Sequence, residues 1–255
     1  MANFIVTIKR MLPTSRFSSR VEKYKRFRPG YPPALIDFLA RECGLTAASR
    51  IADIGSGTGL LSRAFLAAGF SVVGIEPNRE MREAGESGAL DATAEATTLP
   101  DRSIDLIVAG QAFHWFDPAP TRAEWVRILR PPGHVVLVWN ERSRTTPFLR
   151  EYAALVDTYA AARDPGGEIR EAGKSRIAPF FAPQPCAVAE FPNRQTFDFE
   201  GLLGRVVSSS YLPNKGDPDY PTLVGELREL FDRHQRSGTI DFEYRTRAWY
   251  GRLAP

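Results

Sequence analysis

The stretch IADIGSGTG, residues 51–59, limits the possible folds more than any other feature of the chain, because a short apolar run leads directly into Gly55, Gly57 and Gly59. The apolar run predicts a buried strand, and the apolar residues of GLLSRAFLAAG, which follow at once, recur at helical spacing. Glycines between a strand and a helix permit tight backbone geometry and let a ligand approach the main chain closely. The stretch therefore predicts an α/β fold with a ligand at a strand end.

The alternation of strands and helices continues from residue 50 to residue 140. Apolar runs at RIADI, FSVVGIE, SIDLIVAG and GHVVLVWN predict strands, and NREMREAGE and PTRAEWVRILR predict helices between them. Asn78 is a candidate N-cap and Gly69 a candidate C-cap. This alternation predicts a parallel sheet with helices on both faces, joined by right-handed crossovers.

The flanks complete a single predicted domain over residues 1–255, in four parts. Residues 1–45 form an N-terminal lid and the helix YPPALIDFLARECG, and residues 46–142 form the cofactor-binding core. Residues 143–185, with the amphipathic stretch PFLREYAALVDTYAAA, predict a helical cap inserted after the core. Residues 186–255 supply two strands, AVAEFPNRQTFDF and TIDFEYRTRAWYG, with a helix between them, and complete the sheet.

Composition excludes several classes of function. A net charge of +3 is too small to indicate nucleic acid, and the basic group of Lys23, Lys25, Arg26 and Arg28 is typical of a solvated face. No apolar run approaches the roughly 18 residues of a membrane span. Cys43 and Cys186 lack the spacing of a metal site or a disulfide scaffold. We therefore expect a cytoplasmic protein with no metal, nucleic-acid or membrane partner, either a monomer or a homodimer.

Two cofactor classes compete for the glycine loop. A nicotinamide site of the GxGxxG type needs a third glycine at position 60, where the chain has Leu60. Asp53 lies two residues before the first glycine, where its charge repels a pyrophosphate and suits a cofactor that carries a cationic amine and a sulfonium. A P-loop is excluded because no GK[ST] follows.

Two further carboxylates follow predicted strands. Glu76 ends the second strand, where a carboxylate can accept both hydroxyls of a ribose. Glu95 lies in the loop after the expected third strand, where it can accept a hydrogen bond from an exocyclic amine while the Ala96 N–H supplies a ring nitrogen. Taken alone, each carboxylate would be an exposed charge, but the glycine loop before Glu76 favours the ribose role for that residue.

The motifs IADIGSGTG, VVGIEP, TAEATTLPDRSIDLIVAGQAFHWFD and ILRPPGHVVLVWN, in this order, resemble the class I S-adenosylmethionine-dependent methyltransferases, in particular small-molecule enzymes with HWF after the fourth strand. RPGYP and SSSYLP resemble further motifs of that group. The resemblance implies a Rossmann-like seven-stranded sheet of order 3-2-1-4-5-7-6 with its last-numbered strand antiparallel. One departure is SGALDATAEA, whose small and polar residues predict a short third strand.

The same resemblance implies S-adenosyl-L-methionine as the cofactor and S-adenosyl-L-homocysteine as its product. Asp53 and the glycine loop would contact the methionine part, Glu76 the ribose, and residues 94–96 the adenine. The full set of cofactor-binding candidates is Asp53, Gly55, Ser56, Gly57, Gly59, Glu76, Pro77, Ala94, Glu95, Ala96 and Gln111.

His114 is the candidate for the acceptor side, because it follows the fourth strand at the carboxyl edge, where open α/β sheets bind ligands. It is interpreted as a contact to substrate or cofactor, as a general base, or as a structural ring. Phe113 and Trp115 are expected to form an apolar wall beside it. The candidates for substrate contacts and a lid are Tyr24, Arg28, Tyr31, Phe113, Trp115, Asn140, Ser209 and Tyr211, although a packed N-terminal segment fits the first three as well.

The leading hypothesis is methyl transfer to a small-molecule acceptor by in-line displacement, promoted by proximity and by exclusion of water. The alternatives are a nicotinamide-dependent oxidoreductase and a non-catalytic protein that binds S-adenosylmethionine. The sequence carries no signal for the acceptor atom, whether oxygen, nitrogen or carbon.

Overall fold

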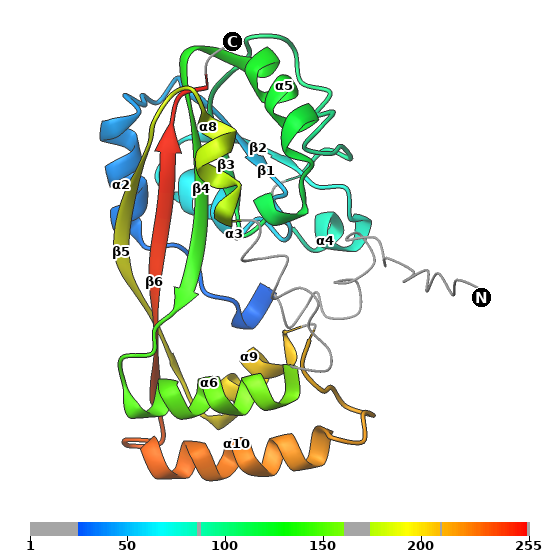
Figure 1. The fold of residues 1–255 in the computed structure, drawn as a ribbon, viewed down its shortest axis with the longest axis vertical. Helices are drawn as coiled ribbons and strands as arrows, with labels where there is room; N and C mark the ends of the chain where they lie inside the picture. The colour runs from blue at the N-terminus through cyan, green and yellow to red at the C-terminus, as the bar shows by residue number, and fades with distance from the viewer. Residues whose placement is uncertain (1–24, 86–87, 161–173, 210, 254–255) are drawn as a thin grey trace, which may run out of the picture.

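The computed structural model describes residues 25–85, 88–160, 174–209 and 211–253. They form a six-stranded sheet of order β2-β1-β3-β4-β6-β5 (Figure 1). β1 to β4 are parallel to one another, and β6 is antiparallel to both β4 and β5. The strands are β1 (Arg50–Ile54), β2 (Ser71–Ile75), β3 (Ile104–Gly110), β4 (Leu129–Arg142), β5 (Cys186–Phe197) and β6 (Ile240–Gly251).

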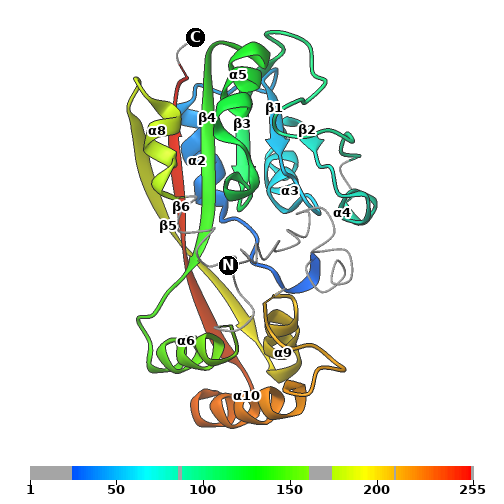
Figure 2. The ribbon, with the colours of Figure 1, turned by 45° about the vertical axis from the view of Figure 1, so that its right-hand side comes forward.

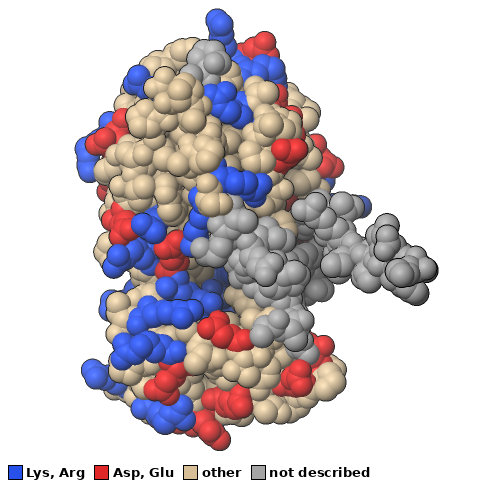
Figure 3. Space-filling view, viewed as in Figure 1, with Lys and Arg blue, Asp and Glu red and all other residues tan. Residues whose placement is uncertain are grey.

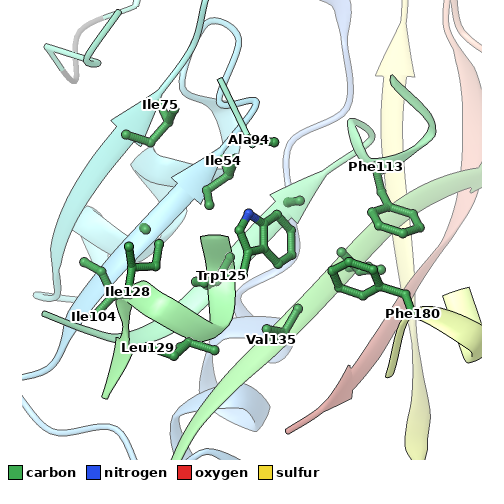
Figure 4. Close-up of a cluster of buried hydrophobic side chains, with 14 of the residues drawn as sticks. Ile54, Ile75, Ala94, Ile104, Phe113, Trp125, Ile128, Leu129, Val135 and Phe180 are labelled. Carbon is green, nitrogen blue, oxygen red and sulfur yellow. The ribbon is translucent and has the colours of Figure 1, made fainter. Parts of the chain in front are cut away.

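Helices cover both faces of the sheet, as the alternating pattern predicts. On one face, α2 (Pro33–Glu42) and α3 (Leu60–Ala67) share a core with residues of β1, β3 and β4. On the other face, α5 (Pro118–Ile128) and the short α8 (Ile177–Phe181) pack on the sheet. Figure 4 shows Trp125 of α5 at the centre of this second core.

A second lobe is built at the far ends of the long strands. Here α6 (Pro147–Ala160), α9 (Phe199–Val207) and α10 (Tyr220–His234) pack around the ends of β5 and β6 (Figure 2). We call these three helices and the strand ends that they cover the helical lobe. Its core includes Tyr152, Leu202, Leu227 and Phe242, all at most 2% exposed.

The expected cap over residues 143–185 is not one unit. Its first helix, α6, packs with α9 and α10 in the helical lobe, whereas α8 packs on the sheet beside α5. The aromatic pair Phe180 and Phe181 explains the split, because both side chains complete the apolar layer around Trp125. The four-part division of the chain remains a prediction.

The expectation of seven strands is wrong for the part of the chain that is described. The stretch SGALDATAEA, where the third strand was expected, forms only isolated bridges in its described part. These bridges join Ile75 to Leu90 and Thr93 to Ala96. Without that strand the remaining order is the one that the resemblance implies, with the corresponding strand antiparallel. Small and polar side chains cover too little apolar surface to support a full strand. Of residues 88–96, which the structure describes, only Ala92 and Ala94 are buried with the sheet core.

The predicted helix ends are confirmed on both sides of β2. Gly69 has a φ of 86° directly after α3, and Asn78 caps α4 (Arg79–Ala84) by accepting the Met81 N–H at 2.8 Å. Because β1 and β2 pair in parallel, the loops that follow them lie side by side. None of the helices in the described ranges is long and apolar enough to cross a membrane.

Candidate cofactor and acceptor site

The carboxyl ends of four parallel strands meet at one edge of the sheet, which faces the helical lobe (Figure 2). The glycine loop follows β1, Glu76 follows β2 and Gln111 follows β3, while Asn140 lies near the end of β4. Topology alone therefore brings together most of the candidates that the sequence indicates.

The glycine loop has a backbone that other residues adopt only under strain. Gly55, Gly57 and Gly59 have φ angles of 70°, 58° and 77°. A Cβ on Gly55 would lie 2.6 Å from the Cβ of Ala112, so the loop packs directly on the turn after β3. The N–H groups of Gly55 and Ser56 both donate to the Ile75 carbonyl, at 2.8 and 3.0 Å. The loop is thus held against the two neighbouring strands.

Glu76 connects the glycine loop to the start of α4. Its Oε2 accepts the Gly57 N–H at 2.8 Å and its Oε1 accepts the Asn78 N–H at 2.9 Å, while Pro77 between them has no N–H to offer. Burial raises the pKa of Glu76, and these two backbone hydrogen bonds oppose the rise. Each carboxylate oxygen keeps a second lone pair, so the carboxylate fits a pair of ribose hydroxyls.

Asp53 is 1% exposed and faces α3. Its Oδ2 accepts the Ser62 hydroxyl at 2.6 Å, and its buried Oδ1 has no hydrogen-bond donor among the described residues. Burial raises the pKa of Asp53 from 3.8 to about 6. A buried acceptor oxygen without a donor fits the cationic amine of a methionine moiety.

The adenine-side candidates are partly engaged within the protein. Oε1 of Glu95 accepts the Asp117 N–H at 3.0 Å, at the start of α5, which leaves Oε2 for an exocyclic amine. The Ala96 N–H, expected to serve a ring nitrogen, instead donates to the Thr93 carbonyl at 3.3 Å. Ala94 is buried with the sheet core.

The turn after β3 carries Gln111 and His114. Gln111 has a φ of 58° and donates its N–H to the Val138 carbonyl at 2.8 Å. His114 lies in the short 3₁₀ helix η3 (Phe113–Trp115), is 9% exposed, and its ring lies 4.8 Å from that of Trp115. Arg176 donates to the His114 carbonyl at 3.2 Å and so ties this turn to the residues before α8.

The expectation that Phe113 lines an acceptor wall is corrected. Its side chain is fully buried, and its ring lies 4.8 Å from that of Phe180 (Figure 4). Because Phe180 comes from α8, far along the chain, the burial of Phe113 follows from tertiary packing. Trp115 is only partly buried and stays a wall candidate.

Residues 25–31, which we call the crossing segment, pass between the sheet edge and the helical lobe (Figure 2). A Cβ on Gly204 of α9 would overlap the Phe27 ring, and Arg28 donates to the Ser208 carbonyl at 3.2 Å. At the other end, a Cβ on Gly110 would overlap the Tyr31 hydroxyl. The segment thus contacts both lobes, which fits a lid and a packed strap equally; Tyr24 lies outside the described residues.

Two asparagines hold the middle of the crossing segment. Asn140 donates to the Gly30 carbonyl at 3.1 Å, and Asn193 of β5 donates to the same carbonyl at 2.8 Å. The side chain of Asn140 therefore binds the crossing segment. Gln111 contacts Asn140 through the backbone carbonyl, which accepts from the Gln111 side-chain amide at 3.4 Å.

Ser209 and Tyr211 lie in the helical lobe, 1% and 8% exposed. The Ser209 hydroxyl accepts a hydrogen bond from Arg205 at 3.2 Å. Arg205 is not among the site residues predicted from the sequence. A visible signal was its place on an otherwise apolar face of α9, between Leu202 and Val206.

An open groove of about 670 Å³ lies beside β5 and β6 and holds none of the glycine-loop residues. Its charged side chains pair with one another or with neighbours: Arg245 with Glu190 at 3.0 Å, and Glu243 with the Thr145 hydroxyl at 3.0 Å. The groove is lined by Ser143, Thr145, Glu190, Phe191, Pro192, Asn193, Arg194, Glu243, Tyr244 and Arg245. We therefore place the cofactor site at the sheet edge and not in this groove.

Comparison with known proteins agrees with this geometry. A family model described as a methyltransferase domain matches residues 52–137, the range that contains the glycine loop, Glu76, Glu95 and His114. A solved structure from Anaeromyxobacter dehalogenans, named as a type II methyltransferase, superposes with a TM-score of 0.69 at 26% identity, covering 90% of this chain and 99% of that one. Residues 52–137 of this chain therefore match a methyltransferase domain, and this match supports the resemblance to the class I S-adenosylmethionine-dependent methyltransferases.

Proteins with similar sequences are found in bacteria and in yeast. An uncharacterized methyltransferase of Mycobacterium tuberculosis is 39% identical over 145 residues, which are 55% of this chain and 58% of the relative. The match thus spans little more than half the length of the mycobacterial relatives. An uncharacterized methyltransferase-like protein of Schizosaccharomyces pombe is 29% identical over 248 residues, which are 94% of this chain and 96% of that protein. The narrower assignment to the HWF type stays a prediction.

Proposed function

We propose that this protein binds S-adenosylmethionine along the carboxyl edge of β1, β2 and β3 and transfers its methyl group to a small molecule. The observation that carries the proposal is the double role of Glu76, which holds the glycine loop through Gly57 and keeps lone pairs for a ribose. The buried Oδ1 of Asp53, which has no hydrogen-bond donor in the part of the chain that the structure describes, supports a cationic amine at the other end of the cofactor.

The cofactor would lie with its methionine part over the glycine loop and its adenine toward residues 94–96. Gly55, Gly57 and Gly59 expose main chain to it, because any Cβ there would bring strain or overlap. Oε2 of Glu95 is the remaining candidate for the exocyclic amine of adenine, since Oε1 already serves Asp117. Gln111, at the end of β3, lies on the inner side of this arrangement.

When bound, the cofactor supplies a methyl group on a sulfonium, so that the acceptor–carbon bond forms as the sulfur–carbon bond breaks and the electron pair stays on sulfur. The residues of this chain hold the acceptor in line and exclude water. Tyr31 lies against Gly110 at the sheet edge, and the crossing segment closes the space toward the helical lobe. Positioning of this kind can lower a barrier by about 7–11 kcal/mol in favourable cases.

His114 has one of two roles on this proposal. If the acceptor carries a proton of high pKa, the imidazole takes that proton; if it does not, the ring only contacts the substrate or cofactor. The hydrogen bond from Arg176 to the His114 carbonyl supports a defined ring position in either case.

Calorimetry of the full chain with S-adenosylhomocysteine tests the cofactor assignment. We expect 1:1 binding in the micromolar range, and no change in NADH fluorescence on titration with the protein. Folded protein that does not bind S-adenosylhomocysteine would contradict the proposal. Binding without turnover on any acceptor would favour the non-catalytic alternative, and NADH binding the oxidoreductase.

A crystal structure with S-adenosylhomocysteine tests the role of His114. The base role requires the imidazole to reach the vacated methyl position within a hydrogen bond or through one water. A ring farther away rules out the base role and leaves the contact to substrate or cofactor.

A further inference from the structure

Arg205 is a buried cation on α9. Its side chain is 5% exposed and lies in the helical lobe, whose core is otherwise apolar or aromatic. Its Nε donates to the Tyr244 hydroxyl at 3.1 Å and its Nη1 to the Ser209 hydroxyl at 3.2 Å. Its Nη2 donates no hydrogen bond to any described residue, so only part of the five-donor fork is used.

No carboxylate of the described residues forms an ion pair or a hydrogen bond with Arg205. The titratable groups that face it are Tyr244, Tyr152 and Tyr211. None of them is a carboxylate that could pair with the guanidinium. A buried charge without an opposite charge is costly, and proteins normally pair it. The guanidinium of Arg205 is thus a buried charge with no opposite charge among the described residues.

A second cation and a buried hydroxyl extend this group of residues. The guanidinium of Arg142, at the end of β4, lies 5.7 Å from the centre of the Tyr152 ring, and Arg142 has no ion pair with a described residue. Tyr152 is 1% exposed and its hydroxyl donates to no described residue. Lys and Arg side chains also gather on the face where the two lobes meet (Figure 3). In the neighbouring groove, by contrast, Arg245 pairs with Glu190.

Arg205 is linked to the crossing segment, and so to the sheet edge. The Tyr244 hydroxyl that accepts from Arg205 donates to Oε1 of Gln195 at 2.9 Å. The amide of Gln195 in turn approaches the Arg28 carbonyl at 3.4 Å. The same segment ends at Tyr31, against Gly110. An anion on Arg205 therefore lies next to the crossing segment, which itself reaches the sheet edge at Tyr31.

We infer that the methyl acceptor is a small acid whose carboxylate or phosphate group is bound by Arg205 and Tyr152 and whose other end receives the methyl group. This inference rests on the proposed function. Arginine binds an oxyanion through parallel N–H groups. Here the N–H groups of Nη2 and the hydroxyl of Tyr152 would donate to the oxygens of the anion. The methyl group goes to another atom of the acceptor, so the anchoring oxyanion keeps its charge throughout.

The test measures anion binding by the full chain saturated with S-adenosylhomocysteine. The probes are succinate, citrate, inorganic phosphate and phosphoserine, each by calorimetry, with succinamide as an uncharged match for succinate. We expect at least one anion to bind with a Kd below about 1 mM and succinamide not to bind. Whether the carboxylates or the phosphates bind more tightly then identifies the anchoring group.

Arg205→Met keeps the length of the side chain and removes the charge. We expect anion binding to weaken roughly tenfold or more while the affinity for S-adenosylhomocysteine stays within about twofold. Arg150→Met, at an exposed position on α6, is the matched control and should change neither affinity. If Arg205→Met does not fold, Tyr152→Phe replaces it, with an expected loss of roughly fivefold in anion binding.

Three results overturn the inference: no anion binds the saturated wild type, succinamide binds as well as succinate, or the folded variants bind anions as well as the wild type does. Failure of the wild type to bind S-adenosylhomocysteine is a separate result and overturns the proposed function instead.

Discussion

Glu76 accepts the backbone N–H of Gly57 at 2.8 Å, and this hydrogen bond joins the loop after β1 to the end of β2. The other oxygen of the same carboxylate accepts the N–H of Asn78, which begins α4. One side chain therefore holds two loops that a cofactor would bridge. Because Glu76 is buried, its removal should affect both the stability of the loop and the binding of the cofactor.

Glu76→Gln replaces one acceptor oxygen with an NH₂ group that faces a backbone donor. We expect the free energy of unfolding to fall by about 1–3 kcal/mol, because one buried N–H loses its acceptor. The affinity for S-adenosylhomocysteine should fall by roughly tenfold or more, since the ribose loses a charged acceptor. Urea unfolding and calorimetry measure the two effects.

Glu80→Gln, at an exposed position in the first turn of α4, is the control and should stay within about 0.5 kcal/mol of the wild type. Equal cofactor affinity in Glu76→Gln and the wild type would remove Glu76 from the ribose site.

Asp53 makes stability depend on pH. Its pKa is about 6 in the folded protein, against 3.8 ordinarily, because the buried carboxyl resists ionisation. The folded state thus holds the proton of Asp53 more tightly than the unfolded state does. The contribution of this carboxyl to the free energy of unfolding is therefore fully present below about pH 4 and is lost as the pH rises through about 6. Two pKa units correspond to about 3 kcal/mol, as an order of magnitude.

Asp53→Asn keeps an acceptor for the Ser62 hydroxyl and has no proton to lose. We expect its free energy of unfolding to lack this decline between pH 4 and 6, and the variant to be more stable than the wild type at pH 7. Urea unfolding across this range checks both points. The exposed Asp37→Asn should show the same dependence of unfolding free energy on pH as the wild type. If Asp53→Asn also shows the wild-type decline between pH 4 and 6, Asp53 is not the group that causes it.

Local patterns predicted the parts of this site that depend on local chemistry. The glycine loop needs positive φ angles at Gly55, Gly57 and Gly59, and Asn78 has the side chain of an N-cap, so both are visible in a few residues of sequence. The strand order, by contrast, was implied by the resemblance to known methyltransferases, and it holds except for the segment near Leu90, which forms only isolated bridges.

The features that were missed depend on contacts between distant parts of the chain. Phe113 is buried because Phe180 packs on it, and no local pattern links the two. The surroundings of Arg205 come from β6 as well as α9, since its hydrogen-bond partner is Tyr244. An arginine in an apolar helix face is a signal, but only the fold indicates which groups surround it.

Gly55→Ala tests the close packing of the loop on the turn after β3. The substitution combines a φ of 70° with a Cβ only 2.6 Å from that of Ala112. We expect a loss of more than about 2 kcal/mol in unfolding free energy and loss of S-adenosylhomocysteine binding. Gly69→Ala has a similar φ of 86° and open space around the new Cβ. It should cost only about 1–2 kcal/mol and leave binding unchanged, and equal effects in the two variants would show that the overlap with Ala112 is unimportant.

Gly204→Ala tests whether the crossing segment packs on the helical lobe. An alanine in the interior of α9 should by itself stabilise the helix by up to about 1 kcal/mol, but here its Cβ would overlap the Phe27 ring. We therefore expect Gly204→Ala to destabilise the wild type and to stabilise a Phe27→Ala background, which has room for the methyl group.

A double-mutant cycle by urea unfolding measures this change of sign, with an expected coupling energy of about 0.5–3 kcal/mol. Gly225→Ala in α10, where nothing lies near the new Cβ, is the matched control and should be neutral or stabilising in both backgrounds. If Gly204→Ala has the same effect with and without Phe27, the ring does not lie on α9 in solution. The crossing segment would then not close the space between the lobes, and the exclusion of water proposed for the site would need another source.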